Sequence, residues 1–323
     1  ISWHWVFLVN LPVGVVVYLL SVALLPGADA RANQQRLDVG GAVTITASSM
    51  LAVYAIVNGN DAGWMSVQTL GLLIAAVTLL GLFLSIEARI RSPLVPLGLF
   101  RLRNVATANL VGVLWAAAVF AWFFISALYL QFVLGYSPLR VGLSFLPANV
   151  IMAAFSLGLS AKLVMRLGLK LPLASGLLFA AVGLALFAQA PVAGRFVSDV
   201  LPGMILLGLG AGIAFNPLLL AAMNDVDHSE SGLASGVVNT AFMMGGALGL
   251  AILASLGTSR SAELLAGGAD MRTALNGGYH YAFIIGALCA VAAAIAAIGL
   301  LRNTGQASAE ASDTVLSASD AGV

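Results

Sequence analysis

The sequence has little charge for its length of 323 residues: 8% of its residues are charged, whereas a soluble domain carries about 25%. So few charges cannot cover the surface of a soluble globular domain. The chain also lacks the low hydrophobicity of a disordered protein. It lacks a basic field for nucleic acid as well, since 14 Lys and Arg nearly balance 13 Asp and Glu. With 61% hydrophobic residues, the composition predicts an all-α polytopic membrane protein.

Cysteine and histidine are also scarce. The single cysteine, Cys289, excludes an internal disulfide and a metal site made of several cysteines. The three histidines, His4, His228 and His280, fall at predicted span ends or in loops and are too scattered for a metal site. No phosphate-binding glycine loop, dinucleotide-binding pattern or hydrolase motif is evident. We therefore expect no cofactor and no enzyme activity.

Long apolar runs make up most of the chain. Because lipid offers the backbone no hydrogen-bond partner, a run of about 20 apolar residues indicates a spanning helix. We predict about nine spans, at Trp5–Leu25, Val39–Val57, Met65–Ile86, Val105–Tyr129, Val141–Val164, Leu171–Ala190, Val200–Ala222, Gly232–Leu256 and Tyr279–Leu301. The Ala-, Ser- and Asp-rich tail at 302–323 is predicted to be a disordered cytoplasmic segment.

Basic residues between the spans predict the orientation. Alternate connections form two classes, and the class richer in Lys and Arg should be cytoplasmic. The larger class contains Arg31, Arg36, Arg89, Arg91, Arg101, Arg103, Lys162, Arg166, Lys170 and Arg302, and the smaller contains Arg140, Arg195, Arg260 and Arg272. We therefore expect Ile1 outside the cell and Val323 in the cytoplasm. Interfacial aromatic residues agree, because they fall at the predicted outer ends: Trp3, Trp5, Trp64, Tyr136, Tyr279 and Tyr281.

Four stretches of the sequence carry a family resemblance, at Ser2–Gly14, Ser92–Arg101, 129–147 and Ser231–Ala247. The first reads Ser-Trp-His-Trp-Val-Phe-Leu-Val-Asn-Leu-Pro-Val-Gly, with His4 where the family pattern has Arg. In order, they resemble the sixth helix, the connection into the ninth, the link from ninth to tenth, and the thirteenth helix of one transporter group. That group is the fourteen-helix drug:proton antiporters (EmrB/QacA type) of the major facilitator superfamily.

This resemblance implies a domain layout. Residues 1–26 would be the last helix of the N-terminal bundle, and residues 27–90 the two extra linking helices. Residues 91–301 would form the C-terminal six-helix bundle, followed by the tail at 302–323. The first five family helices, with that half's signatures for proton coupling, would then be absent. We therefore expect the chain to be the C-terminal portion of a longer protein whose missing N-terminal half is its partner.

The resemblance also implies a function, namely proton-coupled export of hydrophobic or cationic drugs across the cell (inner) membrane by alternating access. The expected partners are a small-molecule drug, protons and the lipid bilayer, with no nucleic acid. Two alternatives of the same fold stay open: an exporter of a dedicated metabolite or self-made antibiotic, and an inactive truncated fragment. A membrane-embedded enzyme is a third, but the span interiors offer no catalytic set beyond the lone Cys289.

Polar residues inside the spans are the first candidates for substrate contact. Three asparagines, Asn149, Asn216 and Asn239, lie within predicted spans, where an amide must find a partner or face water. Asn216 precedes Pro217, which frees a backbone carbonyl and bends a helix. In related transporters the helices equivalent to this span and to Val105–Tyr129 line the cavity, so Asn216 is the strongest candidate. The alternative for each asparagine is a hydrogen bond between helices.

Aromatic residues give a second set of candidates. Trp115, Trp122, Ser126 and Tyr129 fall on one face of a single span, at spacings of seven, four and three residues. A tryptophan away from the membrane surface needs a partner for its N–H, and a cavity would supply one. Such rings also suit flat or cationic drugs through stacking and cation–π contact. The alternative is packing against a neighbouring helix.

A degenerate copy of the superfamily's cytoplasmic loop motif follows the fifth predicted span. The usual order is Asp-Arg-any-Gly-Arg-Lys, and Arg166, Gly168 and Lys170 match it. Met165 and Leu169 do not, so the acid that would cap a helix and pair with charges is missing. The alternative is an ordinary basic cytoplasmic loop.

Overall fold

The computed structural model describes residues 8–24, 38–90, 93–224, 226–227 and 230–302. The chain divides into two units, Ile1–Asp38 and Val39–Val323. In the first unit, α2 spans Asn10–Leu24 and is an apolar helix of 15 residues. His4, His228 and the predicted disordered segment after Arg302 lie outside the described residues.

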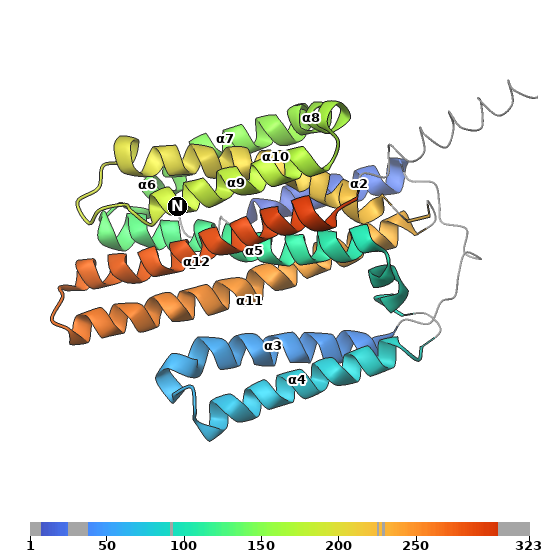
Figure 1. Cartoon of the computed structure of the whole chain (residues 1–323), viewed down its shortest axis with the longest axis horizontal. Coiled ribbons are helices and arrows are strands. Elements are labelled where there is room, and N and C mark those ends of the chain that lie inside the picture. The colour runs from blue at the N-terminus through green and yellow to red at the C-terminus, as the bar shows by residue number, and fades with distance from the viewer. Residues whose placement is uncertain (1–7, 25–37, 91–92, 225, 228–229, 303–323) are drawn as a thin grey trace, which may run out of the picture. The chain divides into compact units, whose positions relative to one another are not determined.

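The described part of the second unit is helical throughout and contains no strand (Figure 1). Its α-helices are α3 (Val39–Ala62), α4 (Val67–Glu87), α5 (Arg103–Leu128), α6 (Pro138–Ser144), α7 (Leu146–Ala154), α8 (Ser160–Leu167), α9 (Lys170–Phe187), α10 (Leu201–Met223), α11 (Ser231–Ala266) and α12 (Met271–Leu300). A 3₁₀ turn, η1 (Leu97–Arg101), and three π-helical turns, η2 (Tyr129–Val133), η3 (Phe155–Leu159) and η4 (Phe196–Val200), complete it. Eight stretches are long and apolar enough to cross a membrane, and α2 is a ninth, shorter apolar helix. The predicted polytopic helical bundle is confirmed.

The last two helices are longer than predicted. α11 continues to Ala266, past the predicted end at Leu256, and α12 begins at Met271 rather than at Tyr279. Polar residues such as Arg260 occupy the added turns, so hydropathy alone ends the helix too early. At 1.5 Å per residue, the 36 residues of α11 extend about 54 Å, well beyond a hydrocarbon core of about 30 Å.

The connection between α11 and α12 is an ordered turn. Arg260 and Glu263 form an ion pair with an N–O distance of 2.9 Å. Asp270 caps α12, because its carboxylate accepts hydrogen bonds from the backbone N–H groups of Thr273 at 3.2 Å and Arg272 at 3.1 Å. Hydrogen bonding, chiefly with Thr273, holds the pKa of the Asp270 carboxyl below its usual value. We call this side of the second unit the hairpin end.

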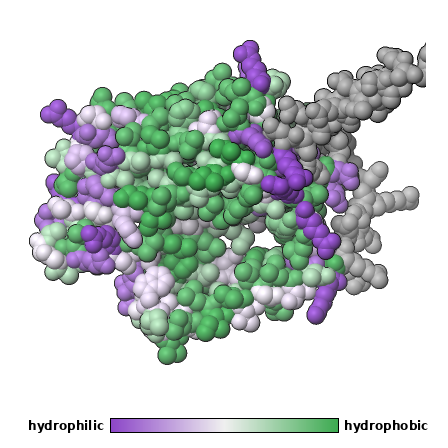
Figure 2. All heavy atoms as spheres, viewed as in Figure 1, coloured by the Kyte–Doolittle hydropathy of each residue, from purple (hydrophilic) through white to green (hydrophobic). Residues whose placement is uncertain are grey.

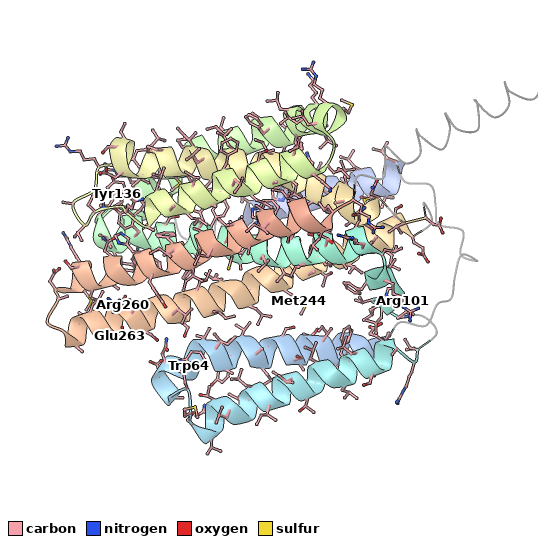
Figure 3. All side chains as sticks on the ribbon, in the orientation of Figure 1. Trp64, Arg101, Tyr136, Met244, Arg260 and Glu263 are labelled. Carbon is pink, nitrogen blue, oxygen red and sulfur yellow. The ribbon has the colours of Figure 1, made fainter. Side chains whose placement is uncertain are left out.

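The opposite side, where α12 stops at Leu300, is the tail end of the second unit. Arg103 at the start of α5 donates from Nε to the Leu300 carbonyl at 2.8 Å, so it satisfies a carbonyl that the helix leaves free. Figure 3 places Arg101, from the larger basic class, at the tail end and Arg260, from the smaller class, at the hairpin end. On the face shown in Figure 2, hydrophobic residues form a band between these two hydrophilic ends. Charge and hydropathy therefore separate as a membrane-spanning bundle requires.

The helix pair α3–α4 belongs to the second unit. It is hydrogen-bonded to α11 close to the α11–α12 connection, at the hairpin end. The side-chain amide of Asn60 donates to the carbonyl and hydroxyl oxygens of Ser255, both at 2.9 Å. The Asn60 Oδ1 atom accepts hydrogen bonds from Ser259 Oγ at 2.8 Å and Trp64 Nε1 at 2.9 Å. Asn60 thereby ties this helix pair to α11 through three hydrogen bonds, a contact that the sequence does not predict.

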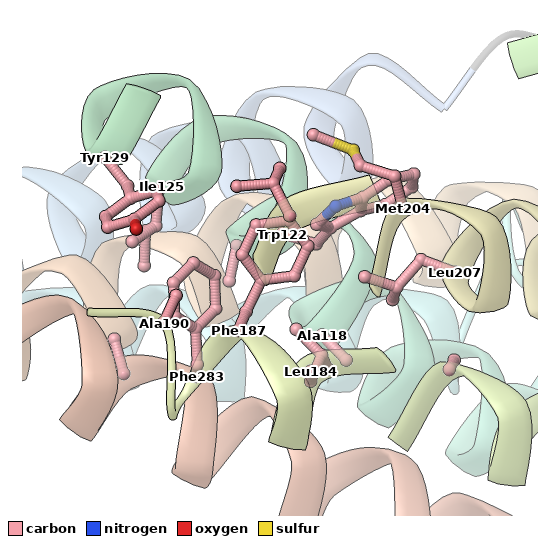
Figure 4. Packing of buried hydrophobic residues seen from close by; sticks show 14 of the residues in the cluster. Ala118, Trp122, Ile125, Tyr129, Leu184, Phe187, Ala190, Met204, Leu207 and Phe283 are labelled. Atoms are coloured by element: carbon pink, nitrogen blue, oxygen red, sulfur yellow. The ribbon is translucent and has the colours of Figure 1, made fainter. Parts of the chain in front are cut away.

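Small residues let the helices of the bundle approach closely. α9 and α10 cross at Gly176 and Gly210, where a methyl group added to Gly210 would lie 2.6 Å from the Gly176 carbonyl oxygen and 2.8 Å from the Ala180 nitrogen. Because lipid is as apolar as the side chains, such packing rather than water exclusion drives helix association in a membrane. The buried core beside this crossing contains Trp122, Phe187 and their neighbours (Figure 4).

Candidate functional site

The four residues predicted on one face of the α5 span do share a face, and that face is buried. Trp115 and Tyr129 are 1% exposed, and Trp122 and Ser126 are fully buried. The Ser126 hydroxyl donates to the Trp122 carbonyl one turn earlier, and the Tyr129 hydroxyl donates to the Pro191 carbonyl at 2.8 Å. The structure thus places all four in packing contacts inside the bundle, while a role in contacting substrate stays a prediction.

Trp115 joins three helices through an aromatic cluster. Its ring lies 5.3 Å from Phe242 of α11 and 6.1 Å from Phe215 of α10, measured between ring centroids. Phe120 of α5 extends the cluster, 6.1 Å from Phe242. Phe120 and Phe215 are half-buried, so these two rings are more accessible than the tryptophan. Neither ring was predicted from the sequence, although Phe215 directly precedes the candidate Asn216.

Trp122 occupies a second aromatic cluster, nearer the hairpin end. Its ring centroid lies 4.2 Å from that of Phe123 and 6.1 Å from that of Phe145. Figure 4 shows its indole among Phe187, Met204 and other apolar side chains. Neither its N–H nor that of Trp115 has a hydrogen-bond partner among the described residues. Two buried donors without partners are unusual, because each forgoes the hydrogen bond it would make in water.

Polar side chains from η2 and α12 converge on the turn between α9 and η4. The Asn276 amide donates to the Ala190 carbonyl at 3.1 Å, and His280 Nε2 lies 2.7 Å from the same oxygen. Since a carbonyl only accepts, Nε2 of His280 carries the proton in this contact. α12 begins at Met271, so His280 lies inside this helix, while its place at the end of a membrane span stays a prediction. Together with Tyr129, these side chains hold the turn in place.

Asn216 connects α10 to the span formed by α7, η3 and α8. Its side-chain amide donates to the Ser156 carbonyl at 3.0 Å. In the other direction, the buried Ser160 hydroxyl donates to the Ile213 carbonyl at 3.0 Å. Asn216 is half-buried and so keeps partial access to the surface. The observed bond is the contact between helices named above as the alternative, and substrate contact by this residue stays a prediction.

The other two asparagines lie on separate helices. Asn149 is half-buried on α7. Asn239 is exposed on α11 next to Thr240, whose hydroxyl bonds back to the Gly236 carbonyl at 2.9 Å. An exposed amide on an apolar helix is expensive to leave in lipid. Asn239 is therefore the most accessible of the three amides for a polar ligand or a neighbouring helix.

The loop motif lies at the turn between α8 and α9. Gly168 ends α8 with a φ of 73°, a left-handed conformation that favours glycine, and its N–H donates to the Val164 carbonyl at 2.9 Å. Arg166 is exposed, and Lys170 is the half-buried first residue of α9. Met165 stands at the acidic position of the motif and is 78% exposed. The backbone conformation at the end of α8 explains why a glycine stands at position 168. For Arg166 and Lys170, both interpretations stay open: a degenerate loop motif or an ordinary basic cytoplasmic loop.

Grooves of sizeable volume lie between the helices, and their linings are apolar. One of about 480 Å³ lies between α5, α11 and α12 and reaches Met244 and Cys289. Another, of about 640 Å³, lies between α3 and α11 beside Tyr54 and Ala247. Among the described residues, no group of three or more His, Cys, Asp or Glu side chains could hold a metal ion. These two grooves therefore offer mainly apolar contacts.

Comparison with known proteins identifies the relatives of this arrangement. The family described as Major Facilitator Superfamily matches residues 1–250. A puromycin resistance protein of Streptomyces alboniger is 32% identical over 296 residues, which are 89% of this chain and 58% of that protein. A cephamycin export protein of Amycolatopsis lactamdurans is 33% identical over 272 residues, 82% of this chain and 56% of that one. An uncharacterized MFS-type transporter of Mycobacterium tuberculosis is 34% identical over 267 residues, 82% and 49% of the two chains. The chain spans about half the length of the curated relatives it matches.

Proposed function

The chain belongs to the Major Facilitator Superfamily, and on that premise we propose that it forms the C-terminal portion of a transporter that exports drugs or antibiotics. The observation that carries this proposal is the sequence match with relatives named for antibiotic resistance and export. The eight apolar helices long enough to cross a membrane agree with it. The family consists of transporters, which argues against the enzyme alternative. A multi-pass membrane setting follows from the family and the helices together.

The proposed mechanism is alternating access between two bundles. One six-helix bundle rocks against the other and exposes a central site to each side of the membrane in turn. Inward proton flow would drive export, with each charge moved worth about 2.3 kcal/mol per 100 mV. The helices α5 to α12 would provide one bundle and one wall of the cavity. The proton-binding groups would lie in the N-terminal half, since the acids of the described spans sit at span ends.

The substrate contacts we propose are apolar and aromatic surfaces with a few amides. Asn149, Asn216 and Asn239 would offer hydrogen bonds, and the cluster around Trp115 would offer aromatic area for flat or cationic drugs. An exporter dedicated to one antibiotic is the second candidate. It is favoured by relatives whose names specify a single compound, including a probable actinorhodin transporter of Streptomyces coelicolor. A panel of dyes and antibiotics distinguishes the two candidates.

We also propose that the tail end faces the cytoplasm, because the larger class of basic residues belongs there. A matched pair of exposed methionines tests this: Met165 on α8 is 78% exposed and Met271 on α12 is 59% exposed. In a transporter whose cysteines, including Cys289, are all replaced by serine, Met271→Cys should react with a membrane-impermeant maleimide in intact cells. Met165→Cys should react only after the cells are permeabilised. The reverse pattern would contradict the orientation.

Export itself is tested by dye accumulation in cells. Cells that make the transporter containing this chain should retain less of a fluorescent cationic dye than cells with an empty vector. Collapsing the proton gradient should remove the difference. Equal accumulation of every dye and antibiotic in the panel, with the protein present in the membrane, would contradict drug export.

A further inference from the structure

Two neighbouring spans each interrupt their own backbone ladder at the same depth in the bundle. Pro217 lies inside α10 and has no N–H, so the Ile213 carbonyl four residues earlier loses its helical partner. In the neighbouring span, the Ser160 N–H bonds to the Phe155 carbonyl five residues back, and therefore does not serve Ser156. Gly158 leaves helical geometry at this point, with φ 176° and ψ −31°.

Each span supplies the hydrogen bond that the other one lacks. The Ser160 hydroxyl donates to the Ile213 carbonyl, and the Asn216 amide donates to the Ser156 carbonyl, both at 3.0 Å. A carbonyl left without a partner inside a membrane protein is costly, which gives both contacts a reason to form. The two breaks are thus joined by a reciprocal pair of side-chain bonds.

The two sides of this junction are held very differently. Before it, α7 lies tightly on α10, since a methyl group on Gly212 would be 2.8 Å from the Met152 carbonyl oxygen. After it, α8 buries little against the described helices, because Ser160 is the one buried residue among its eight. Met165 near its end is 78% exposed. Close packing on one side and a single buried residue on the other allow the segment after the break to move relative to the segment before it.

We propose that η3 is a hinge and that α8 is a movable segment at the tail end, latched to α10 by Ser160 and Asn216. Swinging α8 carries Arg166 and the turn at Gly168 with it, so the hinge repositions the basic loop motif. Short π-helical turns are frequent at functional sites, in keeping with this role. The latch consists of two side-chain hydrogen bonds to backbone carbonyls. Breaking them lets α8 move from the latched position to a released one, while α7 and α10 stay folded in both.

Distances between spin labels in lipid nanodiscs test this hinge. All cysteines of the transporter, including Cys289, are replaced by serine, and paired cysteines are placed at Met165 on α8 and Ile298 on α12, both exposed. Ser160→Ala should broaden this distance distribution or add a second peak, because losing one such bond shifts a two-position equilibrium by up to about ten-fold. Ser160→Thr keeps the hydroxyl and should preserve the narrow distribution. A reference pair at Val150 on α7 and Ile298 should stay unchanged throughout.

A matched control is Ser175→Ala, whose hydroxyl bonds to the Pro172 carbonyl within α9 at 3.0 Å and should leave both pairs unaffected. Gly158→Ala should shift or broaden the Met165 distribution, because alanine favours the helical conformation that Gly158 leaves in the latched structure. An unchanged Met165 distribution in Ser160→Ala, or equal broadening of both pairs, would overturn the hinge. Since the readout is a distance, this result is independent of whether the protein exports drugs.

Discussion

Replacing Gly210 with leucine is expected to lower the free energy of unfolding by about 3 kcal/mol or more, the upper range for overpacking a core. The reason is the crossing of α9 and α10, where the first added carbon atom would already lie 2.6 Å from the Gly176 carbonyl oxygen. Backbone atoms block the site on this side, and they cannot turn away as a flexible side chain can. The two helices must therefore separate along their length. Thermal unfolding of the purified protein in detergent measures the change.

The same substitution at Gly71 is the matched control. This glycine lies on the exposed face of α4, where an added methyl group meets no atom within 4 Å. Leucine there should raise stability slightly, by about 0.5–1 kcal/mol, because glycine weakens a helix interior. Similar unfolding temperatures for the Gly210 and Gly71 variants would show that the close crossing does not exist.

Truncating Trp122 to alanine is expected to lower the free energy of unfolding by about 3–5 kcal/mol, the usual range for a buried tryptophan. The ring is fully buried among Phe123, Phe145 and the residues shown in Figure 4. Its removal leaves a cavity whose walls lose their dispersion contacts, and lipid cannot fill it. Phe124→Ala on the exposed side of the same helix removes a comparable ring and should have a much smaller effect.

Trp122→Phe separates packing from hydrogen bonding at the same position. The indole N–H has no partner among the described residues, and a buried donor in that state costs about 1–3 kcal/mol. Phenylalanine removes that donor while keeping most of the ring, so the variant should be far closer to the wild type than Trp122→Ala. Equal destabilisation by both substitutions would show that the N–H has a partner, such as a water molecule or substrate.

Hydropathy and charge predicted the membrane-spanning bundle well, because each depends on the local sequence. An 18- to 25-residue apolar run must form a helix in lipid, so the spans could be placed without knowing their neighbours. The same reasoning ended α11 too early at Leu256, since a helix does not stop where its hydropathy falls. The polar turns beyond it, up to Ala266, are held by helical hydrogen bonds and the ordered turn to α12.

Contacts between distant segments could not be predicted in this way. Nothing near Asn60 in the sequence indicates Ser255 and Ser259, which lie almost 200 positions away and meet it only in the folded bundle. Asn216 was singled out as a polar residue beside Pro217, yet the carbonyl it bonds, at Ser156, follows from a π-helical turn in another span. The aromatic face of α5 was likewise recognised by its spacing, while its burial depends on how the neighbouring helices pack.

Dye transport by membrane vesicles tests most directly our proposal that this chain forms the C-terminal part of a proton-driven drug exporter. Inside-out vesicles from cells that make the transporter containing the chain receive a cationic fluorescent dye and a proton gradient, acidic inside. We predict uptake of the dye into the vesicles, loss of that uptake when an ionophore collapses the gradient, and little uptake with the unstable Gly210→Leu variant. The contradicting result requires that the wild-type protein is intact in the membrane. It is that, for every dye and antibiotic in the panel, uptake is no greater than in vesicles lacking the protein.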